Sequence, residues 1–353
     1  MENLLHVGLD VGSTTVKIVV MNENRNTIYR DYQRHFSDTK NTVCNVLENL
    51  ATRYPNSLLT IALTGSGAMS AAKFLDLPFI QEVVACKRAV EKYIPQTDVV
   101  IELGGEDAKI IYFDKSIEQR MNGTCAGGTG AFIDQMASLL HTDPTGLNEL
   151  AKKYKMIYPI ASRCGVFAKT DIQPLLNEGA AKEDIAASIF QAVVNQTISG
   201  LACGRPIRGH VAFLGGPLNY LSELRKRFIE TLKLTDEKII VPDEAHLLVA
   251  KGAALDSVNT NAITIEKLRS KIGVLKVSHD DTSVPLHPLF TTDLEYEEFK
   301  KRHENNKVEN KDLKTYKGNA YIGIDAGSTT TKLVLIDDDG HLLYSLYGSN
   351  EAV

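Results

Sequence analysis

Hydrophobic and polar positions follow two alternating periods along the first 258 residues. Short apolar runs bounded by glycine, proline or asparagine predict strands, and longer stretches with apolar residues three and four positions apart predict helices. After an opening hairpin, strands are predicted at 58–65, 98–105, 109–114, 209–216 and 238–242. Helices are predicted at 39–53, 68–75, 84–93, 130–140, 145–153, 171–177, 181–202 and 218–232, with a last one at 244–258. This alternation is typical of an α/β fold.

The opening hairpin occurs twice in the chain. VGLDVGSTTVKIVV at 7–20 and IGIDAGSTTTKLVL at 322–335 are identical at eight of fourteen positions under one offset of 315. Each copy predicts a strand, a tight Gly-Ser turn, a second strand, a polar turn and a third strand. The second copy stops after its third strand, so we expect 319–353 to be the start of a second domain in the front portion of a longer protein.

The stretch between the two copies changes character after residue 258. Residues 259 to about 290 predict a short helix and a short strand outside the main fold. Residues 293–318 are almost wholly charged or polar, which is typical of a solvated helix followed by a linker.

Composition narrows the class of protein. The 353 residues are 43% hydrophobic and 24% charged with a formal net charge of -5, which gives no electrostatic footprint for nucleic acid. Neither a run of 18 apolar residues nor a signal peptide is evident, so we expect a cytoplasmic protein with no membrane contact. Five cysteines in that compartment favour free thiols or metal ligands over disulfides.

Three glycine-bearing turns each follow a predicted strand. They are DVGSTTVK at 10–17, ELGGEDAK at 102–109 and FLGGPLNY at 213–220. Any one alone would usually be a simple tight turn, and the first could be a plain β-hairpin. In this order and spacing they resemble the two phosphate loops and the adenosine loop of the actin, sugar-kinase and Hsp70 ATPase superfamily.

That resemblance covers residues 4–258 and implies two lobes of the ribonuclease-H-like fold with ATP or ADP in the cleft between them. We therefore expect four regions. They are lobe I at 1–95, with the helix 244–258 packing back on it, lobe II at 96–258, a linker at 259–318 and the partial second domain at 319–353.

The residue types suit phosphate and Mg²⁺. The backbone from Gly12 to Thr15 and the hydroxyls of Ser13, Thr14 and Thr15 can donate to phosphate oxygens, and Lys17 adds a charge. Asp10 and Glu102 end the two phosphate-loop strands, where they could hold Mg²⁺ through its water shell. The remaining expected contacts are Gly104 and Gly105 to the γ-phosphate, Glu106 to the attacking water, and Gly215, Gly216 and Asn219 to adenine and ribose.

Two further segments contain cysteines next to glycines. NGTCAGGTGAFIDQMA at 122–137 and SRCGVFAKTDI at 162–172 resemble the cysteine segments of the 2-hydroxyacyl-CoA dehydratase activators, the BadF/BadG/BcrA/BcrD ATPase family. Cys125 and Cys164 fall on that family's cluster-ligand positions. The resemblance implies a homodimer in which two cysteines from each subunit hold one [4Fe-4S] cluster. It also implies reduced ferredoxin or flavodoxin as electron donor and a dehydratase or reductase component as acceptor.

Elementary chemistry agrees with this assignment. A [4Fe-4S] cluster needs four thiolates, so a chain that offers two finds the others on a symmetry mate. Both cysteines precede predicted helices, whose N-termini stabilise thiolates. We expect the other three cysteines, Cys44, Cys86 and Cys203, to be buried small hydrophobes.

Two glutamates distinguish this chain from the small activators of that family. Those usually have Asp and Gln where this chain has Glu102 and Glu106, and this variant resembles the long fused proteins of the family. An ATP-hydrolysing activase is the leading hypothesis. The alternatives are a small-molecule kinase of the same fold and a nucleotide-sensing module without catalysis.

Overall fold

The computed structural model describes residues 3–113, 117–122, 127–162, 165–278, 286–327 and 329–349. The chain forms two compact units: the first comprises 1–171 and 181–279, and the second comprises 172–180 and 280–353. The first unit contains two five-stranded sheets and the second contains one three-stranded sheet.

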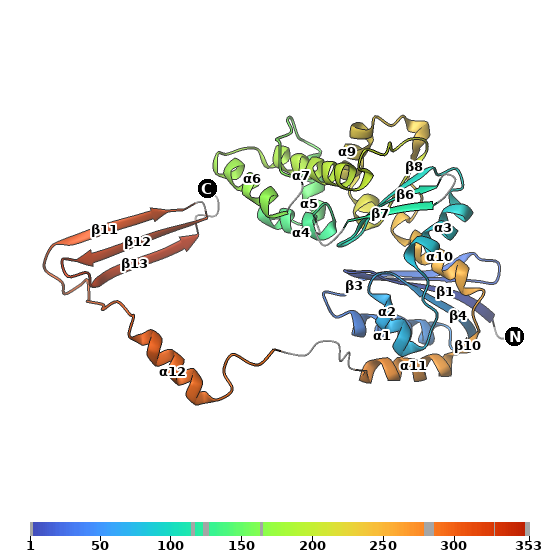
Figure 1. Ribbon diagram of the computed structural model, residues 1–353, viewed down its shortest axis with the longest axis horizontal. Helices are drawn as coiled ribbons and strands as arrows, with labels where there is room; N and C mark the ends of the chain where they lie inside the picture. Colours follow the sequence, from blue (N-terminus) through green and yellow to red (C-terminus); the bar gives the residue numbers. More distant parts are fainter. Residues whose placement is uncertain are drawn as a thin grey trace. The chain divides into compact units, whose positions relative to one another are not determined.

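We call the two sheets of the first unit sheet A and sheet B (Figure 1). Sheet A has the strand order β10-β4-β1-β2-β3, formed by β1 (Asn3–Val11), β2 (Thr15–Met21), β3 (Thr27–Arg34), β4 (Ser57–Thr64) and β10 (Ile263–Thr264). Sheet B has the order β7-β6-β5-β8-β9, formed by β5 (Val99–Leu103), β6 (Ala108–Phe113), β7 (Ile117–Met121), β8 (Val211–Leu214) and β9 (Ile239–Ile240).

The two sheets share one topology over four of their five strands. In each, an antiparallel three-strand meander (β1-β2-β3 or β5-β6-β7) is extended by a parallel strand, β4 or β8, beside its first strand. The first strand of each meander and the parallel strand beside it are largely buried on both faces, which explains why the sequences of β1, β4, β5 and β8 are mostly apolar. Each meander therefore places its first turn at the same end of its sheet.

Helices cover both faces of sheet A (Figure 1). Three of them, α1 (Thr39–Arg53), α2 (Ala68–Leu75) and α11 (Ile265–Val277), bury their apolar faces in one core with β1, β2 and β4. Two others, α3 (Glu82–Tyr93) and α10 (Leu248–Ser257), lie between the sheets. The packing there is close, since a Cβ on Gly8 of β1 would lie 2.0 Å from the carbonyl oxygen of Ala250.

The other helices of the first unit accompany sheet B. They are α4 (Gly130–Leu139), α5 (Pro144–Ala151), α7 (Lys182–Thr197), a π-helical turn (Ile198–Ala202), α8 (Gly216–Tyr220) and α9 (Ser222–Leu232). The helix α6 (Gly165–Asn177) begins in the first unit and ends in the second. The stretch 182–202 is long and apolar enough to cross a membrane, but 67% of that window is buried inside the protein, as in a core helix.

The region after 258 departs from the sequence-based expectation. The expected placement of 259–290 outside the main fold is wrong for its first part, because β10 pairs antiparallel with β4 and α11 belongs to the core of sheet A. The apolar positions of α11 are spaced three and four apart, so they form one buried stripe. Its buried residues are Ile265, Leu268, Ile272 and Leu275.

Two other elements also differ. The helix expected at 171–177 begins at Gly165, and the strand β7 was not expected. The residues of β7 alternate between exposed and partly exposed at the edge of sheet B, so its sequence IEQRM lacks the apolar signal of a buried strand.

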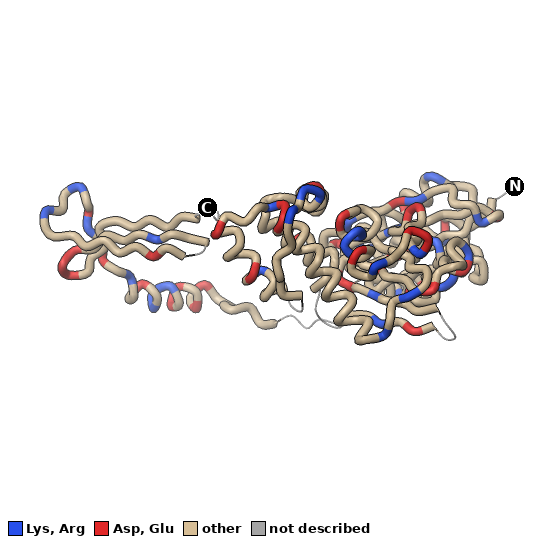
Figure 2. Tube along the Cα trace, turned by 90° about the horizontal axis from the view of Figure 1, so that it is seen from above, with Lys and Arg blue, Asp and Glu red and all other residues tan. Residues whose placement is uncertain are grey.

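The second unit contains the repeated hairpin and a charged helix. The helix α12 (Asp293–Glu304) starts with a capping box at Thr292 and Glu295, and charged residues run along it in Figure 2. The sheet consists of β11 (Ala320–Ala326), β12 (Thr330–Asp337) and β13 (Leu342–Ser349). Its register repeats that of the first copy: Asp325 faces Lys332 as Asp10 faces Lys17.

The two copies differ in burial. Leu9 is fully buried in sheet A, whereas Ile324, at the equivalent place in β11, is 65% exposed. Tyr321, Ile322 and Tyr347 are exposed as well. The second copy therefore has the backbone of the first without an equivalent core around it in the described residues.

Candidate nucleotide-binding site

A cavity of about 360 Å³ lies where the turns of sheets A and B meet. Its lining comes from β2, β3, β5 and α8, from the turns after β1, β5 and β8, and from the start of α4 and α5. The residues are Thr14, Thr15, Lys17, Tyr32, Arg34, Glu102, Gly104, Gly105, Gly130, Ile133, Asp134, Asp143, Pro144, Thr145, Gly215, Gly216, Pro217, Tyr220 and Leu221.

The first turn joins β1 to β2 and carries a buried ion pair. The Gly12 amide donates to the Thr15 carbonyl at 2.9 Å, which closes the turn. Lys17 Nζ lies 2.7 Å from Asp10 Oδ2. Burial alone would lower the pKa of Lys17, but the attraction of Asp10 and then Glu102 raises it, so the lysine stays charged. The other oxygen of Asp10, Oδ1, is buried and has no hydrogen-bond partner among the described residues.

The second turn joins β5 to β6 and carries a related group of charges. Glu102 faces Lys109 in the strand register, but Lys109 Nζ lies 2.7 Å from Oε1 of Glu82 at the start of α3. Glu102 Oε2 is consequently buried with no hydrogen-bond partner within the part of the chain that the structure describes. Burial, reinforced by Glu102, raises the pKa of Glu82 to about 7, and these carboxylates raise the pKa of Lys109 despite its burial.

The first and second turns touch each other. A Cβ on Gly105 would lie 2.1 Å from Thr14 Oγ1, so only glycine fits there without a shift. The Glu106 amide donates to Ser13 Oγ at 3.1 Å. An ion pair between Arg34 and Asp134 joins β3 to α4 along the cavity wall.

The second turn is also bonded to α4. The amides of Gly130 and Ala131, at the first turn of that helix, donate to the carbonyls of Gly104 at 3.0 Å and Gly105 at 2.7 Å. Residues that would contact a phosphate are thus fixed to the helix that follows the segment of Cys125.

The third turn follows β8 and leads into α8. Gly215 has φ +88°, and a Cβ there would lie 2.0 Å from the Leu103 carbonyl oxygen, so both its conformation and its neighbours require glycine. Tyr220, just after this turn, forms an aromatic group with Tyr32 and His246, with ring centroids 5.1–6.1 Å apart. Burial and the nearby Lys17 lower the pKa of His246 to about 4, so this ring is neutral.

The cavity contains many of the residues expected from the sequence. Eight of them line it: Thr14, Thr15, Lys17, Glu102, Gly104, Gly105, Gly215 and Gly216. Asp10 lies behind Lys17, and the exposed Glu106 contacts the first turn through its backbone. Gly12, Ser13 and Asn219 do not line the cavity.

The cysteines divide into three groups. Cys125 and Cys164 lie outside the described residues. Cys44 and Cys86 are buried, as expected. The expectation for Cys203 is wrong, because it is exposed at φ 45° where the π-helical turn after α7 ends and the chain reverses.

Sequence reasoning missed several residues of the site. Tyr32 and Arg34 come from β3, whose alternating pattern indicates only a strand, and Asp134 comes from α4. Glu82 and Lys109 are 27 residues apart, and no local pattern connects them. The glycines could be found in the sequence because a tight turn restricts the residue type at its own position. A contact between residues far apart in the chain leaves no such local pattern.

The charges fit a magnesium nucleotide. Two buried carboxylates, Asp10 and Glu102, each keep one oxygen without a partner in the described structure, and such oxygens can accept hydrogen bonds from the waters of hydrated Mg²⁺. Lys17 and the amides of two glycine turns supply positive charge for phosphates. The arrangement suits phosphoryl transfer, which depends on positioning and charge neutralisation.

Comparisons with known proteins agree with this fit. Residues 7–257 match the BadF/BadG/BcrA/BcrD ATPase family. The 2-hydroxyisocaproyl-CoA dehydratase activator of Clostridioides difficile is 31% identical over 256 residues, which cover 70% of this chain and 93% of that protein. The (R)-2-hydroxyglutaryl-CoA dehydratase activating ATPase of Acidaminococcus fermentans is 31% identical over 216 residues, 60% of this chain and 82% of that protein.

Solved structures of such activators share the fold. Component A of the Acidaminococcus fermentans (R)-2-hydroxyglutaryl-CoA dehydratase has a TM-score of 0.63 at 27% identity, covering 75% of this chain and 99% of that one. The 2-hydroxyisocaproyl-CoA dehydratase activator from Clostridium difficile, solved with bound ADPNP, has a TM-score of 0.61 at 26% identity, covering 79% and 100%. The expected α/β, two-lobed ribonuclease-H-like fold is confirmed.

Proposed function

Because this chain belongs to the BadF/BadG/BcrA/BcrD ATPase family, we propose that it hydrolyses ATP in the cavity between sheets A and B and activates a 2-hydroxyacyl-CoA dehydratase-type or related reductase partner. The unpartnered oxygens of Asp10 and Glu102, one from each sheet, are the observation that carries the proposal. Relatives named as dehydratase activators support the partner class.

The residues of the cavity would divide the work. Asp10 and Glu102 would hold Mg²⁺ through its water, and the ion would neutralise charge on the β- and γ-phosphates. Lys17 and the first turn would bind phosphate oxygens, while Gly104 and Gly105 would approach the γ-phosphate. Glu106 would orient the attacking water once the turns move around substrate. Gly215, Gly216 and Asn219 would flank adenine and ribose, where Pro217 and Tyr220 add apolar surface.

We further propose that Cys125 and Cys164 hold half of a [4Fe-4S] cluster shared by two subunits, fed by reduced ferredoxin or flavodoxin. The bonds from Gly130 and Ala131 to the second turn support a link between nucleotide and cluster. A shift of Gly104 and Gly105 on loss of the γ-phosphate would move the start of α4, and with it the segment that contains Cys125.

The hydrolysis test compares two equivalent carboxylates. In purified full chain with Mg²⁺ and ATP, Asp10→Asn or Glu102→Gln should lower phosphate release by at least about a hundredfold. Asp325→Asn is the matched control, because Asp325 contacts Lys332 at 2.9 Å in the second copy as Asp10 contacts Lys17. Equal loss in the control, or phosphate transfer to a small-molecule acceptor instead of water, would contradict the ATPase proposal.

The cluster test is separate. Anaerobic reconstitution should give about four irons per dimer, as a cluster of this type requires. Cys125→Ala or Cys164→Ala should abolish iron binding, whereas Cys203→Ala, a change of an exposed cysteine, should keep it. Iron binding that survives the first two changes would refute the ligand assignment and leave the hydrolysis result standing.

A further inference from the structure

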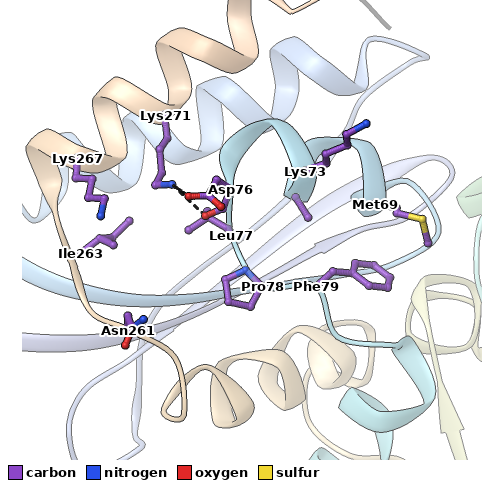
Figure 3. A pocket seen from close by; sticks show the side chains of 11 residues that line it. Met69, Lys73, Asp76, Leu77, Pro78, Phe79, Asn261, Ile263, Lys267 and Lys271 are labelled. Atoms are coloured by element: carbon purple, nitrogen blue, oxygen red, sulfur yellow. Dashed lines mark hydrogen bonds and ion pairs between the residues drawn. The ribbon is translucent and has the colours of Figure 1, made fainter. Parts of the chain in front are cut away.

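A second and larger cavity, about 700 Å³ in volume, opens on the outer side of sheet A (Figure 3). It is bounded by α2, the segment that follows α2, β10 and the first half of α11. Its lining residues are Met69, Ala72, Lys73, Asp76, Leu77, Pro78, Phe79, Asn261, Ile263, Lys267 and Lys271. None of these residues lines the nucleotide cavity, so the two are separate sites within the first unit.

The base of this groove is apolar and fixed to the sheet. The backbone of Leu63 in β4 is bonded twice to the segment that follows α2: its carbonyl accepts from the Ile80 amide at 2.8 Å, and its amide donates to the Pro78 carbonyl at 2.9 Å. Leu77 is tied to α2 through the Ala72 carbonyl at 3.0 Å. Because the backbone beneath it is held in this way, the groove is a preformed concavity of the size that small-molecule sites have.

The groove carries more positive than negative charge, although the whole protein is acidic. Lys267 and Lys271 lie one helical turn apart on α11, on the side that faces Asp76 and Leu77 (Figure 3). Lys73 on α2 also lines the groove, with its ammonium pointing away from Asp76 (Figure 3). The lining residues include three lysines and one carboxylate, Asp76, which gives a net charge of about +2.

The single carboxylate holds only one of these lysines. Lys271 Nζ lies 2.8 Å from Asp76 Oδ2 and 3.0 Å from the Asp76 carbonyl oxygen. The Asp76 side chain is 94% exposed and can turn into water, whereas Lys271 is only 13% exposed. In the described ranges the ammonium groups of Lys267 and Lys73 have no hydrogen-bond or ion-pair partner, and Lys267 is the one that lies beside Lys271 (Figure 3). An anion that arrives at this end would therefore meet one unpaired ammonium and one that Asp76 can release.

We propose that this groove binds a small organic anion with at least two negative charges at one end and an apolar body. The charged end, a phosphate or a pair of carboxylates, takes the place of the Asp76 carboxylate on Lys271 and also contacts Lys267. The apolar body covers Leu77, Pro78 and Ile263. This inference does not depend on ATP hydrolysis, because it uses no residue of the nucleotide site.

The binding test uses bis-ANS, an aromatic probe with two sulfonates, in fluorescence titrations of the full chain. Lys267→Glu should weaken its binding at least about tenfold, whereas Arg269→Glu, the same charge change at another exposed position of α11, should leave it unchanged. Asp76→Asn should tighten binding about threefold, because it removes the competing charge. Asparagine suits the left-handed backbone at this position, φ 46°, so the variant keeps the local fold.

A direct readout locates the probe. Bound bis-ANS should protect Lys267 from acetylation by an N-hydroxysuccinimide ester, measured by mass spectrometry, while Lys301 on α12 should react as before. Equal binding by the Lys267→Glu and Arg269→Glu variants, or no protection of Lys267, would overturn the proposal. Protection by a glutamate-rich peptide and not by bis-ANS would also overturn it, since the groove would then be a protein-docking surface.

Discussion

The pair formed by Lys109 and Glu82 gives the most direct test of the electrostatics beneath the nucleotide cavity. Their charged atoms are 2.7 Å apart, and the side chains are 4% and 22% exposed. Coulomb attraction at that separation is about 6 kcal/mol for an effective dielectric constant near 20. The desolvation of both groups offsets much of this, so the net effect must be measured as a coupling free energy.

The perturbation is Lys109→Met, which keeps the length of the side chain and removes its charge. The partly exposed Glu82 and the buried Glu102 would then be left as neighbouring carboxylates without a cation between them, and the free energy of unfolding should fall by about 3–5 kcal/mol. Glu82→Gln should lower it less, because Lys109 can then engage Glu102, which it faces in the strand register. Urea unfolding of both single variants and the double variant should give a coupling of about 2–3 kcal/mol.

The matched control is the exposed pair Lys87–Glu91 on the same helix as Glu82. Its atoms are 3.5 Å apart and the side chains are 43% and 50% exposed, so its coupling should be about 0.3–0.5 kcal/mol. A coupling between Lys109 and Glu82 no larger than that of the control would refute the reasoning. Solvent would then screen the Lys109–Glu82 ion pair as strongly as it screens a surface ion pair.

Three further predictions concern packing and pH. Gly8→Ala would place a methyl group 2.0 Å from the Ala250 carbonyl oxygen and should prevent stable folding. Gly273→Ala in α11 has no atom within 4 Å of the added methyl group, so it should raise the unfolding free energy by about 0.5–1 kcal/mol in the same urea assay. Leu268→Ala should lower the free energy of unfolding by about 2–5 kcal/mol, because Leu268 is buried in the core of sheet A. An unchanged free energy of unfolding would show that α11 is a detached linker helix. The pKa of His246 is lowered to about 4, so between about pH 6.5 and 4 the unfolded chain binds a proton that the folded chain does not, and the free energy of unfolding falls as the pH falls. His246→Phe should remove about 2 kcal/mol of that fall, a value that allows for the partial exposure of the ring. Urea midpoints measured across this pH range give the difference.

Much of the architecture could be read from local patterns. Helices 39–53 and 68–75 have the expected ends, because an Asp38 cap marks the start of the first and apolar spacing defines both faces. The three glycine turns were found because backbone geometry restricts residue type at each of them independently. Their convergence on one cavity followed from the family resemblance, since nothing in the spacing alone brings 14, 105 and 216 together.

What escaped prediction depends on contacts between distant segments. Ile263 and Ile265 look like linker residues until β4 is available for pairing and the core of sheet A for burial. The exposure of Cys203 depends on a left-handed turn after a π-helical segment, for which the sequence gives no clear signal. Likewise, Lys109 donates to Glu82 and not to the Glu102 it faces, a choice that only the position of α3 decides.

The repeated sheet of the second unit has a consequence for handling the protein. In the first copy, β1 has a partner on each side, β2 and β4. Among the described strands, β11 pairs with β12 only, so its other edge has no partner. Unpaired backbone along a strand, flanked by exposed Ile322 and Ile324, is a template for strand addition from another molecule. Concentrated samples of this chain should therefore self-associate through residues 320–326, and a lysine or proline introduced there should delay precipitation.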